Sequence, residues 1–481
     1  MNKILKIIFA VLSTIGTLTI IVVLWEFTVK PILMDDNSNN NPNPNPTVTQ
    51  TPLSTPPPTN PSISLEERFS SGDRRLFINK PNPQVDQGIA AFKAGNYDEA
   101  KQFFTDGIKA DQKDPEVQIY LNNSEARKKG NPFVLAAVVP VDTKATNAEE
   151  MLRGVADAQT KFNKQGLNNR LLEIMIVNDS NEPDIAQKVA QKLANNSAIL
   201  GVIGHNSSSA SASALIQYEK AGIPMISPTS TSTSLFSNVF FRTVPSDAKA
   251  GEILARYAID DNINKVAIFY TSASNYSTSL KDAFIKYFEQ LGKVSIFDLS
   301  LTNFNAKNTV EVLQNQVDSF VLLPNTEQDI TNLSLQVAKA NYQLSTPMKL
   351  LGGDALYNPA TLTFGGDAVE GLVLAVPWFA KDTYFYTNTA AKRWGGRVSW
   401  RTATSYDATQ ALINALSTDA TRNTVLNQLK QTNLSREDTS GETLQFLRNG
   451  DRNTDPILVK VIKGLKNAPE GSHYSFEIIN E

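Results

Sequence analysis

From Phe133 onward, short apolar runs alternate with longer amphipathic stretches. The runs are apolar at consecutive positions, which is typical of strands buried on both faces of a parallel sheet. They read FVLAAVV, LLEIMIV, AILGVIG, GIPMIS, KVAIFY, SFVLLP, MKLLGG and EGLVLAV. Stretches with helical spacing lie between them, including Ala148–Lys164, Pro183–Asn195, Ala248–Asp260 and Ser279–Leu291. This order predicts parallel sheets with right-handed crossovers, and the number of strands favours an α/β fold of two doubly wound lobes.

The first 82 residues have a different pattern. Two lysines precede an uncharged apolar run from Ile7 to Leu24, which is about long enough to span a bilayer. We expect residues 1–34 to form a single-pass inner-membrane anchor with the rest of the chain outside the cytoplasm, and a cleaved signal peptide is the alternative. Residues 35–82 are predicted to be a linker, because most of this stretch is rich in Asn, Pro, Thr and Ser.

Residues 83–131 return to helical spacing and precede the α/β region. Gly88, Gly95, Tyr97, Ala100, Phe104 and Pro115 fall close to the pattern of a tetratricopeptide repeat. The stretch therefore resembles one such repeat, a helical hairpin, followed by a further helix. A single unit needs a neighbour to bury its apolar face, so we expect it to be docked or self-capped. A spacer and a binding module for a partner protein both remain open as its role.

Composition excludes several kinds of chemistry. The chain has no cysteine, which removes disulfides, thiolate nucleophiles and cysteine–zinc sites. Its only histidines are His205 and His473, so histidine-based catalysis and a multi-histidine metal site are not expected. The formal net charge is −3, which gives no indication of a nucleic-acid partner. We therefore expect neither an enzyme nor a protein with a cofactor.

Hydroxyl side chains gather where two of the predicted strands end. Ser207 and Ser208 follow the strand Ile199–Ile203, and Thr229 and Thr231 follow the run that ends at Ile226. The N–H groups at the start of the next helix, together with these hydroxyls, would bind a small carboxylate without a formal positive charge. Ordinary helix capping is the alternative. The stretch lacks the lysine of a phosphate-binding loop and the G-x-S-x-G of a hydrolase.

The stretch GVIGHNSSSASASALIQYEKAGIPMISPTSTSTS resembles the type I periplasmic binding proteins of the branched-chain amino-acid family. The resemblance continues in order through VFFRTVPSD, KVAIFYTSASNYSTSLKDAF, LLGGDALYNP, GGDAVEGLVLAVPWF, SYDATQALINAL and GDRNTDPILVKVIKG. It covers Pro132 to about Gly464. It implies one domain over 132–481 with a three-crossing hinge near Asp247, near Pro377 and at 435–442. Lobe 1 would hold about 132–247 and 378–437, and lobe 2 about 248–377 and 438–481.

The resemblance also implies roles for individual residues. Ser208, with Ser207 as the adjacent candidate, matches a residue that holds the ligand α-carboxylate, as do Thr229 and Thr231. On the opposing lobe, Tyr276 matches an aromatic residue and Asp354 the acidic residue that pairs with the α-ammonium. Thr326 occupies a position often filled by tyrosine. The segments SASNYSTS and LLPNTEQD depart from the family pattern, so the sequence leaves the ligand open.

Three functions fit these expectations. The resemblance implies an extracytoplasmic protein that captures an amino acid or a similar small polar solute for an ABC permease. A membrane-anchored ligand sensor is the second. The third is a regulatory adaptor of the envelope that uses the helical segment and the two lobes for protein contacts.

Overall fold

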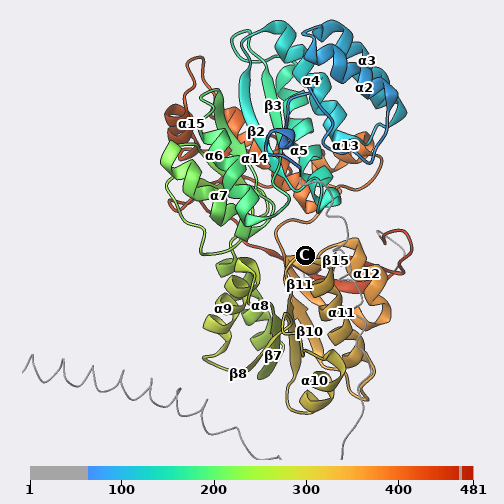
Figure 1. Cartoon of the computed structure of the whole chain (residues 1–481). Coiled ribbons are helices and arrows are strands. Elements are labelled where there is room, and N and C mark those ends of the chain that lie inside the picture. Colours follow the sequence, from blue (N-terminus) through green and yellow to red (C-terminus); the bar gives the residue numbers. More distant parts are fainter. Residues whose placement is uncertain (1–62, 465–467, 480–481) are drawn as a thin grey trace, which may run out of the picture. The chain divides into compact units, whose positions relative to one another are not determined.

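The computed structural model describes residues 63–464 and 468–479, and its elements belong to one compact unit, Ile63–Glu481 (Figure 1). The predicted anchor over 1–34 lies outside the described residues. Within those residues, no helix is both long enough and apolar enough to cross a membrane.

The sheet of lobe 1 has the strand order β1-β3-β2-β4-β5-β6, in which only β1 is antiparallel to its neighbour. Its strands are β1 (Phe69–Ser70), β2 (Phe133–Val139), β3 (Leu172–Asn178), β4 (Ile199–Ile203), β5 (Met225–Ser227) and β6 (Phe240–Arg242). The helices of this lobe are α5 (Ala145–Asn163), α6 (Pro183–Ala194), α7 (Ser208–Ala221), α13 (Phe385–Trp394), α14 (Trp400–Asn414) and α15 (Arg422–Leu429). A short separate sheet pairs β12 (Asn433–Leu434) with β13 (Leu444–Gln445).

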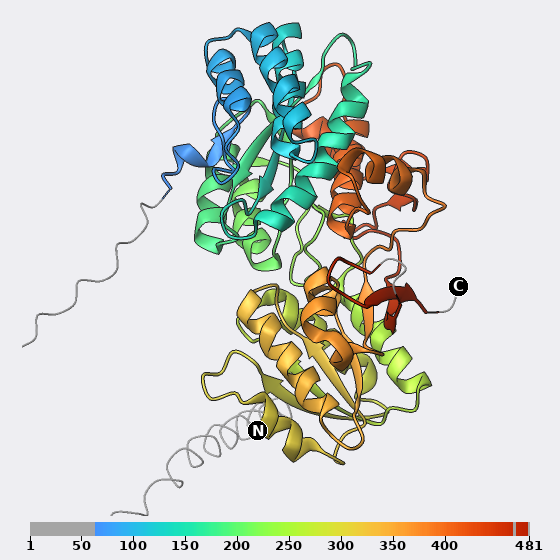
Figure 2. The ribbon, with the colours of Figure 1, turned by 90° about the vertical axis from the view of Figure 1, so that its right-hand side faces the viewer.

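The sheet of lobe 2 has the order β15-β14-β11-β10-β9-β7-β8, with β14 antiparallel to both of its neighbours. Its strands are β7 (Lys265–Tyr270), β8 (Lys293–Asp298), β9 (Ser319–Leu323), β10 (Lys349–Gly352), β11 (Val373–Val376), β14 (Ile457–Lys463) and β15 (Tyr474–Ile478). The helical elements of the lobe are α8 (Asp247–Asp260), α9 (Asn275–Phe288), α10 (Ala306–Leu313), α11 (Gln328–Tyr342), η2 (Asp354–Leu356), α12 (Pro359–Gly365) and η3 (Gly366–Val369). Figure 2 shows α11 and α12 lying against this sheet.

The predicted fold class is confirmed, because each predicted apolar run contains an observed strand and the sheets are mostly parallel. The crossings between the lobes lie between β6 and α8, between β11 and α13, and between β13 and β14. The third crossing comes later than the predicted 435–442. Leu434 and Leu444 are the physical reason, since both side chains are buried in the core of lobe 1.

The helical segment before the α/β region consists of α2 (Pro83–Lys93), α3 (Tyr97–Ala110) and α4 (Pro115–Lys129), and it packs on lobe 1. A glycine lets α2 and α3 approach each other closely, since a Cβ on Gly88 would lie 2.6 Å from the ring of Phe104. The buried Asn123 side chain on α4 donates to Ile174 O at 2.8 Å and accepts from Ile174 N at 2.9 Å. It thus satisfies backbone groups of β3, and the segment is docked.

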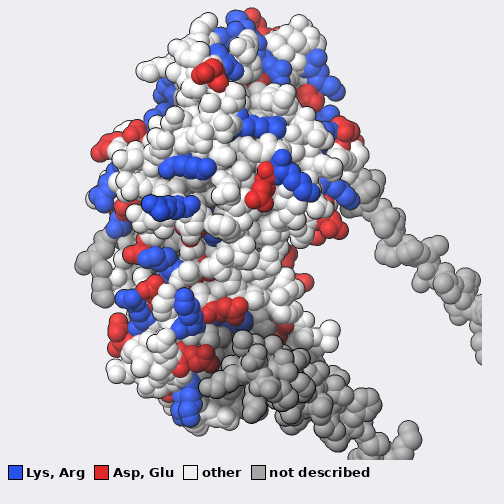
Figure 3. All heavy atoms as spheres, turned by 90° about the vertical axis from the view of Figure 1, so that its left-hand side faces the viewer, with Lys and Arg blue, Asp and Glu red and all other residues white. Residues whose placement is uncertain are grey.

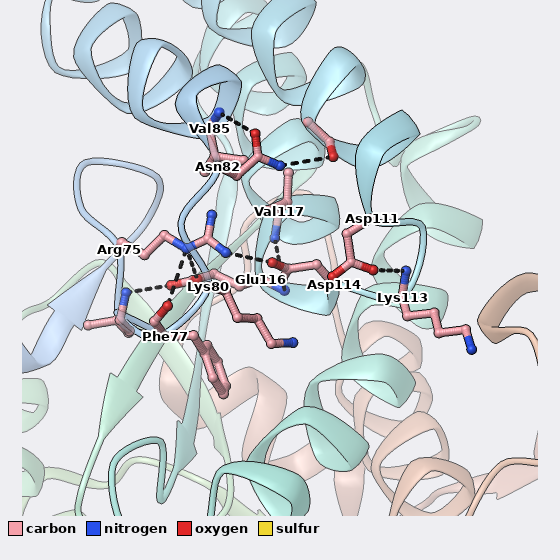
Figure 4. Close-up of polar contacts among 12 residues, drawn as sticks. Arg75, Phe77, Lys80, Asn82, Val85, Asp111, Lys113, Asp114, Glu116 and Val117 are labelled. Carbon is pink, nitrogen blue, oxygen red and sulfur yellow. Dashed lines mark hydrogen bonds and ion pairs between the residues drawn. The ribbon is translucent and has the colours of Figure 1, made fainter.

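The predicted linker over 35–82 is wrong for residues 63–82, because they also pack on lobe 1. Its residues 35–62 lie outside the described residues. Besides β1, they include η1 (Glu66–Arg68) and the buried Phe77. Figure 4 shows how Arg75 joins this stretch to the start of α4, donating from Nη2 to Asp114 Oδ2 at 2.8 Å. Its Nε lies 3.4 Å from Glu116 Oε2. Aromatic and arginine side chains replace the proline-rich composition here, which gives the chain enough surface to bury.

Candidate functional site

A cavity of about 270 Å³ lies between the two lobes. Its lobe 1 wall consists of residues 181–183 before α6, residues 206–209 at the start of α7, Thr229, Trp400 and Arg401. Its lobe 2 wall consists of Ala273, Ser274, Tyr276, residues 325–327 before α11, Asp354 and Ala355. Most of these residues follow the carboxyl ends of parallel strands, where ligands bind in open α/β sheets.

The predicted candidates divide into two groups. The structure brings together six of them in the cavity wall, namely Ser207, Ser208, Thr229, Tyr276, Thr326 and Asp354. It places the seventh, Thr231, outside that wall. Arg242 explains the difference, because its Nη1 donates to the carbonyl oxygens of Ser230 and Ser232 at 3.3 and 2.9 Å and holds the intervening residue. Thr231 O instead accepts the N–H of Asp247 at 2.8 Å, at the hinge.

The start of α7 presents hydrogen-bond donors to the cavity. Ser207 is the N-cap residue, and its hydroxyl accepts the N–H of Ala210 at 3.2 Å. The N–H groups of Ser208 and Ser209 belong to the first helical turn and have no intrahelical acceptor. Ser208 Oγ accepts the N–H of Ser232 at 3.3 Å, which leaves its hydroxyl hydrogen available for a ligand. A carboxylate placed here would also interact favourably with the helix dipole.

Thr229 has a different position in this wall. Its hydroxyl donates to the carbonyl oxygens of Asn206 and His205, at 2.7 and 3.1 Å. The single hydroxyl hydrogen is therefore engaged within the loop. Thr229 thus fixes the backbone that leads into α7.

On the facing wall, Asp354 begins η2 and is buried. Burial raises the pKa of its carboxyl, whereas the Tyr276 hydroxyl bond and the nearby Arg401 guanidinium oppose that rise. The Tyr276 hydroxyl also accepts the N–H of Ala355 at 3.2 Å, which fixes the ring beside the carboxyl. A buried carboxylate in such a wall would be stabilised by an ammonium partner.

Thr326 lies where the lobes meet at the edge of the cavity. Its carbonyl oxygen accepts from Lys144 Nζ of lobe 1 at 3.3 Å, and the same ammonium lies 2.7 Å from Glu327 Oε2. A weaker contact joins the lobes nearby, since the N–H of Asn275 lies 3.5 Å from Ser209 Oγ. Both lobes thus contact each other beside the candidate ligand groups.

His205, in the loop between β4 and α7, is a packing residue. It is fully buried, with Nδ1 2.6 Å from Asp179 Oδ2 and Nε2 3.1 Å from Tyr218 OH. Both ring nitrogens are therefore engaged, and the ring does not line the cavity.

Sequence reasoning missed Trp400 and Arg401, which also line the cavity. They form the first turn of α14, a helix that is buried over most of its length. One signal was available, because a cation at a helix N-terminus opposes the helix dipole and is unfavourable there. Arg401 at this position therefore indicates a role other than stabilising the helix.

The geometry defines a two-lobed binding protein with its site in the cleft. The chain belongs to the family described as "Periplasmic binding protein", because residues 136–466 match the sequence pattern of that family. Enzymatic activity is not a property of this family of solute-binding proteins.

Curated relatives match part of the chain. It is 26% identical over 250 residues to the "Leucine-, isoleucine-, valine-, threonine-, and alanine-binding protein" of Pseudomonas aeruginosa, covering 50% of this chain and 66% of that protein. It is 26% identical over 242 residues to the Leu/Ile/Val-binding protein of Escherichia coli K12, covering 49% and 63%. The chain thus spans about two thirds of the length of these relatives, or slightly less.

Solved structures match almost three quarters of the chain. The leucine-binding protein LivK of Thermotoga maritima has a TM-score of 0.62 at 20% identity, covering 72% of this chain and 98% of that one. LivJ of Streptococcus pneumoniae, in complex with isoleucine, has a TM-score of 0.61 at 17% identity, covering 73% and 99%. At these identities the likeness establishes the fold.

Proposed function

We propose that this protein is an extracytoplasmic solute-binding protein that captures an amino acid between its lobes for an ABC importer. The observation that carries the proposal is the pairing of two walls across one cavity. The start of α7 offers neutral donors, and Asp354 lies on the facing lobe. An amino acid carries one carboxylate and one ammonium, which suit these two walls.

Each predicted residue then has a role. Ser207, Ser208 and the free N–H groups of α7 hold the α-carboxylate, while Asp354 and Tyr276 hold the α-ammonium. Thr229 positions the α7 loop, and Thr326 borders the ligand at the cavity edge. Thr231 acts at the hinge and does not contact the ligand. The names of the curated relatives support an amino acid as the ligand.

The remaining parts of the chain complete the proposal. Residues 1–34 anchor the protein in the inner membrane, and the family supports a location outside the cytoplasm. Residues 83–131, the segment that resembles a tetratricopeptide repeat, extend lobe 1 and offer a surface for a protein partner. The mixed charge of the face in Figure 3, where Lys and Arg are interspersed with Asp and Glu, fits a small-molecule ligand without strong electrostatic steering.

A thermal-shift screen of the full chain in detergent against the twenty amino acids tests the proposal. At least one amino acid is expected to raise the melting temperature, and Asp354→Asn is expected to weaken its binding by about tenfold or more. Asp282→Asn is the matched control, because Asp282 lies on α9 of the same lobe with a side chain that is 62% exposed. No stabilisation by any amino acid would contradict the proposal and favour the adaptor function.

A further inference from the structure

Arg401 is a buried cation with few partners inside the protein. Its residue is 6% exposed, and within the described part of the chain its guanidinium makes one hydrogen bond, from Nη1 to Glu150 Oε2 at 3.3 Å. Its carbon Cζ lies 4.5 Å from the centre of the Trp400 ring. The Nε atom is buried without a hydrogen-bond partner among the described residues. An arginine has five N–H donors, so most of this group's hydrogen-bonding capacity is unused within the protein.

The position of this cation matters because it lies in the wall of the ligand cavity. In the proposed binding mode, the α-carboxylate occupies the start of α7 and the α-ammonium occupies Asp354. Arg401 is then a permanent positive charge left to meet the rest of the ligand. Glu150, its one hydrogen-bonding partner, lies outside the wall of this cavity.

The composition of the wall disfavours an aliphatic ligand side chain. None of its residues is leucine, isoleucine, valine, phenylalanine or methionine. Its apolar residues are Pro183, Ala273 and Ala355, which lie in the wall with the rings of Tyr276 and Trp400. A branched aliphatic side chain would therefore lie beside a buried charge, without large aliphatic side chains to pack against.

Three acidic residues line the cavity with Arg401. The carboxyl of Asp354 interacts electrostatically with the Arg401 guanidinium, and in the proposed binding mode it also pairs with the ligand α-ammonium. The other two acidic residues do not pair with Arg401. Glu182 is exposed to solvent, and Glu327 is paired with Lys144 of the facing lobe. Both therefore oppose an acidic ligand less strongly than a buried, unpaired carboxylate would.

We propose that Arg401 determines specificity by selecting an amino acid whose side chain ends in a carboxylate. A carboxylate accepts two parallel hydrogen bonds from a guanidinium, which adds both strength and geometric selectivity. This inference rests on the proposed function, because it assigns the side-chain part of the same site.

Calorimetric titration of the full chain with L-glutamate, L-glutamine and L-leucine tests the inference, because glutamate and glutamine differ in charge but hardly in shape. Wild-type protein is expected to bind glutamate about tenfold more tightly than glutamine, or better. Arg401→Met should abolish this preference, and Arg401→Lys should retain part of it. Arg397→Met is the control, because Arg397 lies near the same helix but outside this cavity.

The outcomes separate the two proposals. Binding of leucine or glutamine in preference to glutamate would overturn the role of Arg401 and leave the amino-acid function standing. A glutamate preference that survives in a folded Arg401→Met variant would also overturn it. Binding of no amino acid by the wild type would overturn the proposed function itself. A melting curve of each variant establishes whether it is folded. If Arg401→Met does not fold, the glutamate preference of Arg401→Lys is measured in its place.

Discussion

Helix α14 carries two buried charged clusters that differ in how completely they are compensated. Near its middle, Asp407 meets Arg452, which donates to Asp407 Oδ2 at 2.7 Å and to three backbone oxygens, those of Thr243, Glu442 and Thr443. At its start, Arg401 donates to no described residue other than Glu150. Both arginines are buried to a similar extent.

This difference in compensation separates a charge that stabilises the fold, that of Arg452, from a charge that binds ligand, that of Arg401. A buried ion is costly unless its donors and acceptors are satisfied. Arg452 and Asp407 come much closer to that condition than Arg401 does. Both terminal nitrogens of Arg452 donate, and only its Nε lacks a hydrogen-bond partner among the described residues. Ser440 adds its N–H at 2.6 Å and its hydroxyl at 2.9 Å to the Asp407 carboxylate. Together they join α14 to the first and third crossings between the lobes. The donors of Arg401 are not satisfied in this way, and Arg401 lines the cavity.

The largest expected effect comes from removing the structural charge. Arg452→Met leaves Asp407 buried without its cation, and the free energy of unfolding should fall by about 3–5 kcal/mol. Urea unfolding of the variant and of the wild type measures this loss of stability. Arg448→Met on the exposed loop nearby is the control and should change stability by no more than about 0.5 kcal/mol. Equal effects of the two substitutions would contradict the structural assignment.

A second buried carboxyl gives an effect that depends on pH. Burial raises the pKa of Asp247 at the hinge to about 7, with the charge of Asp354 adding to the rise and the Thr231 hydroxyl opposing it. Since the folded-state pKa is above the unfolded value, its stabilising contribution is present below about pH 4 and is lost as the pH rises towards 7.

Asp247→Asn should therefore gain stability relative to the wild type across this window. The relative gain approaches about 1.4 kcal/mol per pH unit, because one proton is involved. Urea unfolding at pH 5 and pH 7 measures it, and Asp282→Asn should show no such gain. Parallel pH profiles for Asp247→Asn and the wild type would refute the assignment.

Removing the binding charge should affect stability less. Arg401→Met eliminates the cost of burying an underpaired cation and leaves Glu150 partly accessible to water, with a side chain that is 16% exposed. The free energy of unfolding should change by about 1 kcal/mol or less. Urea unfolding beside Arg452→Met measures the contrast. A loss as large as that of Arg452→Met would remove the distinction between the two clusters.

The smallest effect is expected at the ion pair between Lys144 and Glu327. It joins the lobes, but the glutamate side chain is 49% exposed, so the pair is worth about 0–1 kcal/mol. Lys144→Met should weaken ligand binding by about fivefold at most, and less in high salt. Lys281→Met, which removes an ion pair within lobe 2, is the calorimetric control. A loss above tenfold would show that this pair dominates closure.

The sequence predicted most of the core strands because they are continuous apolar runs. It did not predict β1, which is two residues long, or β8, an edge strand with mostly exposed or half-buried side chains. Their apolar signal is weak because they bury little surface. The docking of residues 63–82 depends on long-range contacts such as Arg75 with Asp114, which periodicity does not encode.

The residues of the candidate site also divide into those that the sequence could place and those that it could not. Residues that directly follow strands, such as Ser208 and Thr229, could be placed from chain order alone. Thr231 could not, because its position depends on Arg242 from another strand. Arg401 enters the cavity from a helix almost two hundred residues after the α7 loop, so only the fold brings them together.

The most direct test of the central claim compares one amino acid with its analogue that lacks the α-amine. The amino acid that gives the largest thermal shift and this analogue are titrated calorimetrically into the full chain. If Asp354 and Tyr276 hold the α-ammonium opposite the start of α7, the amino acid should bind about tenfold more tightly, or better. Equal affinities would contradict the account, because the facing wall would then not recognise the ammonium.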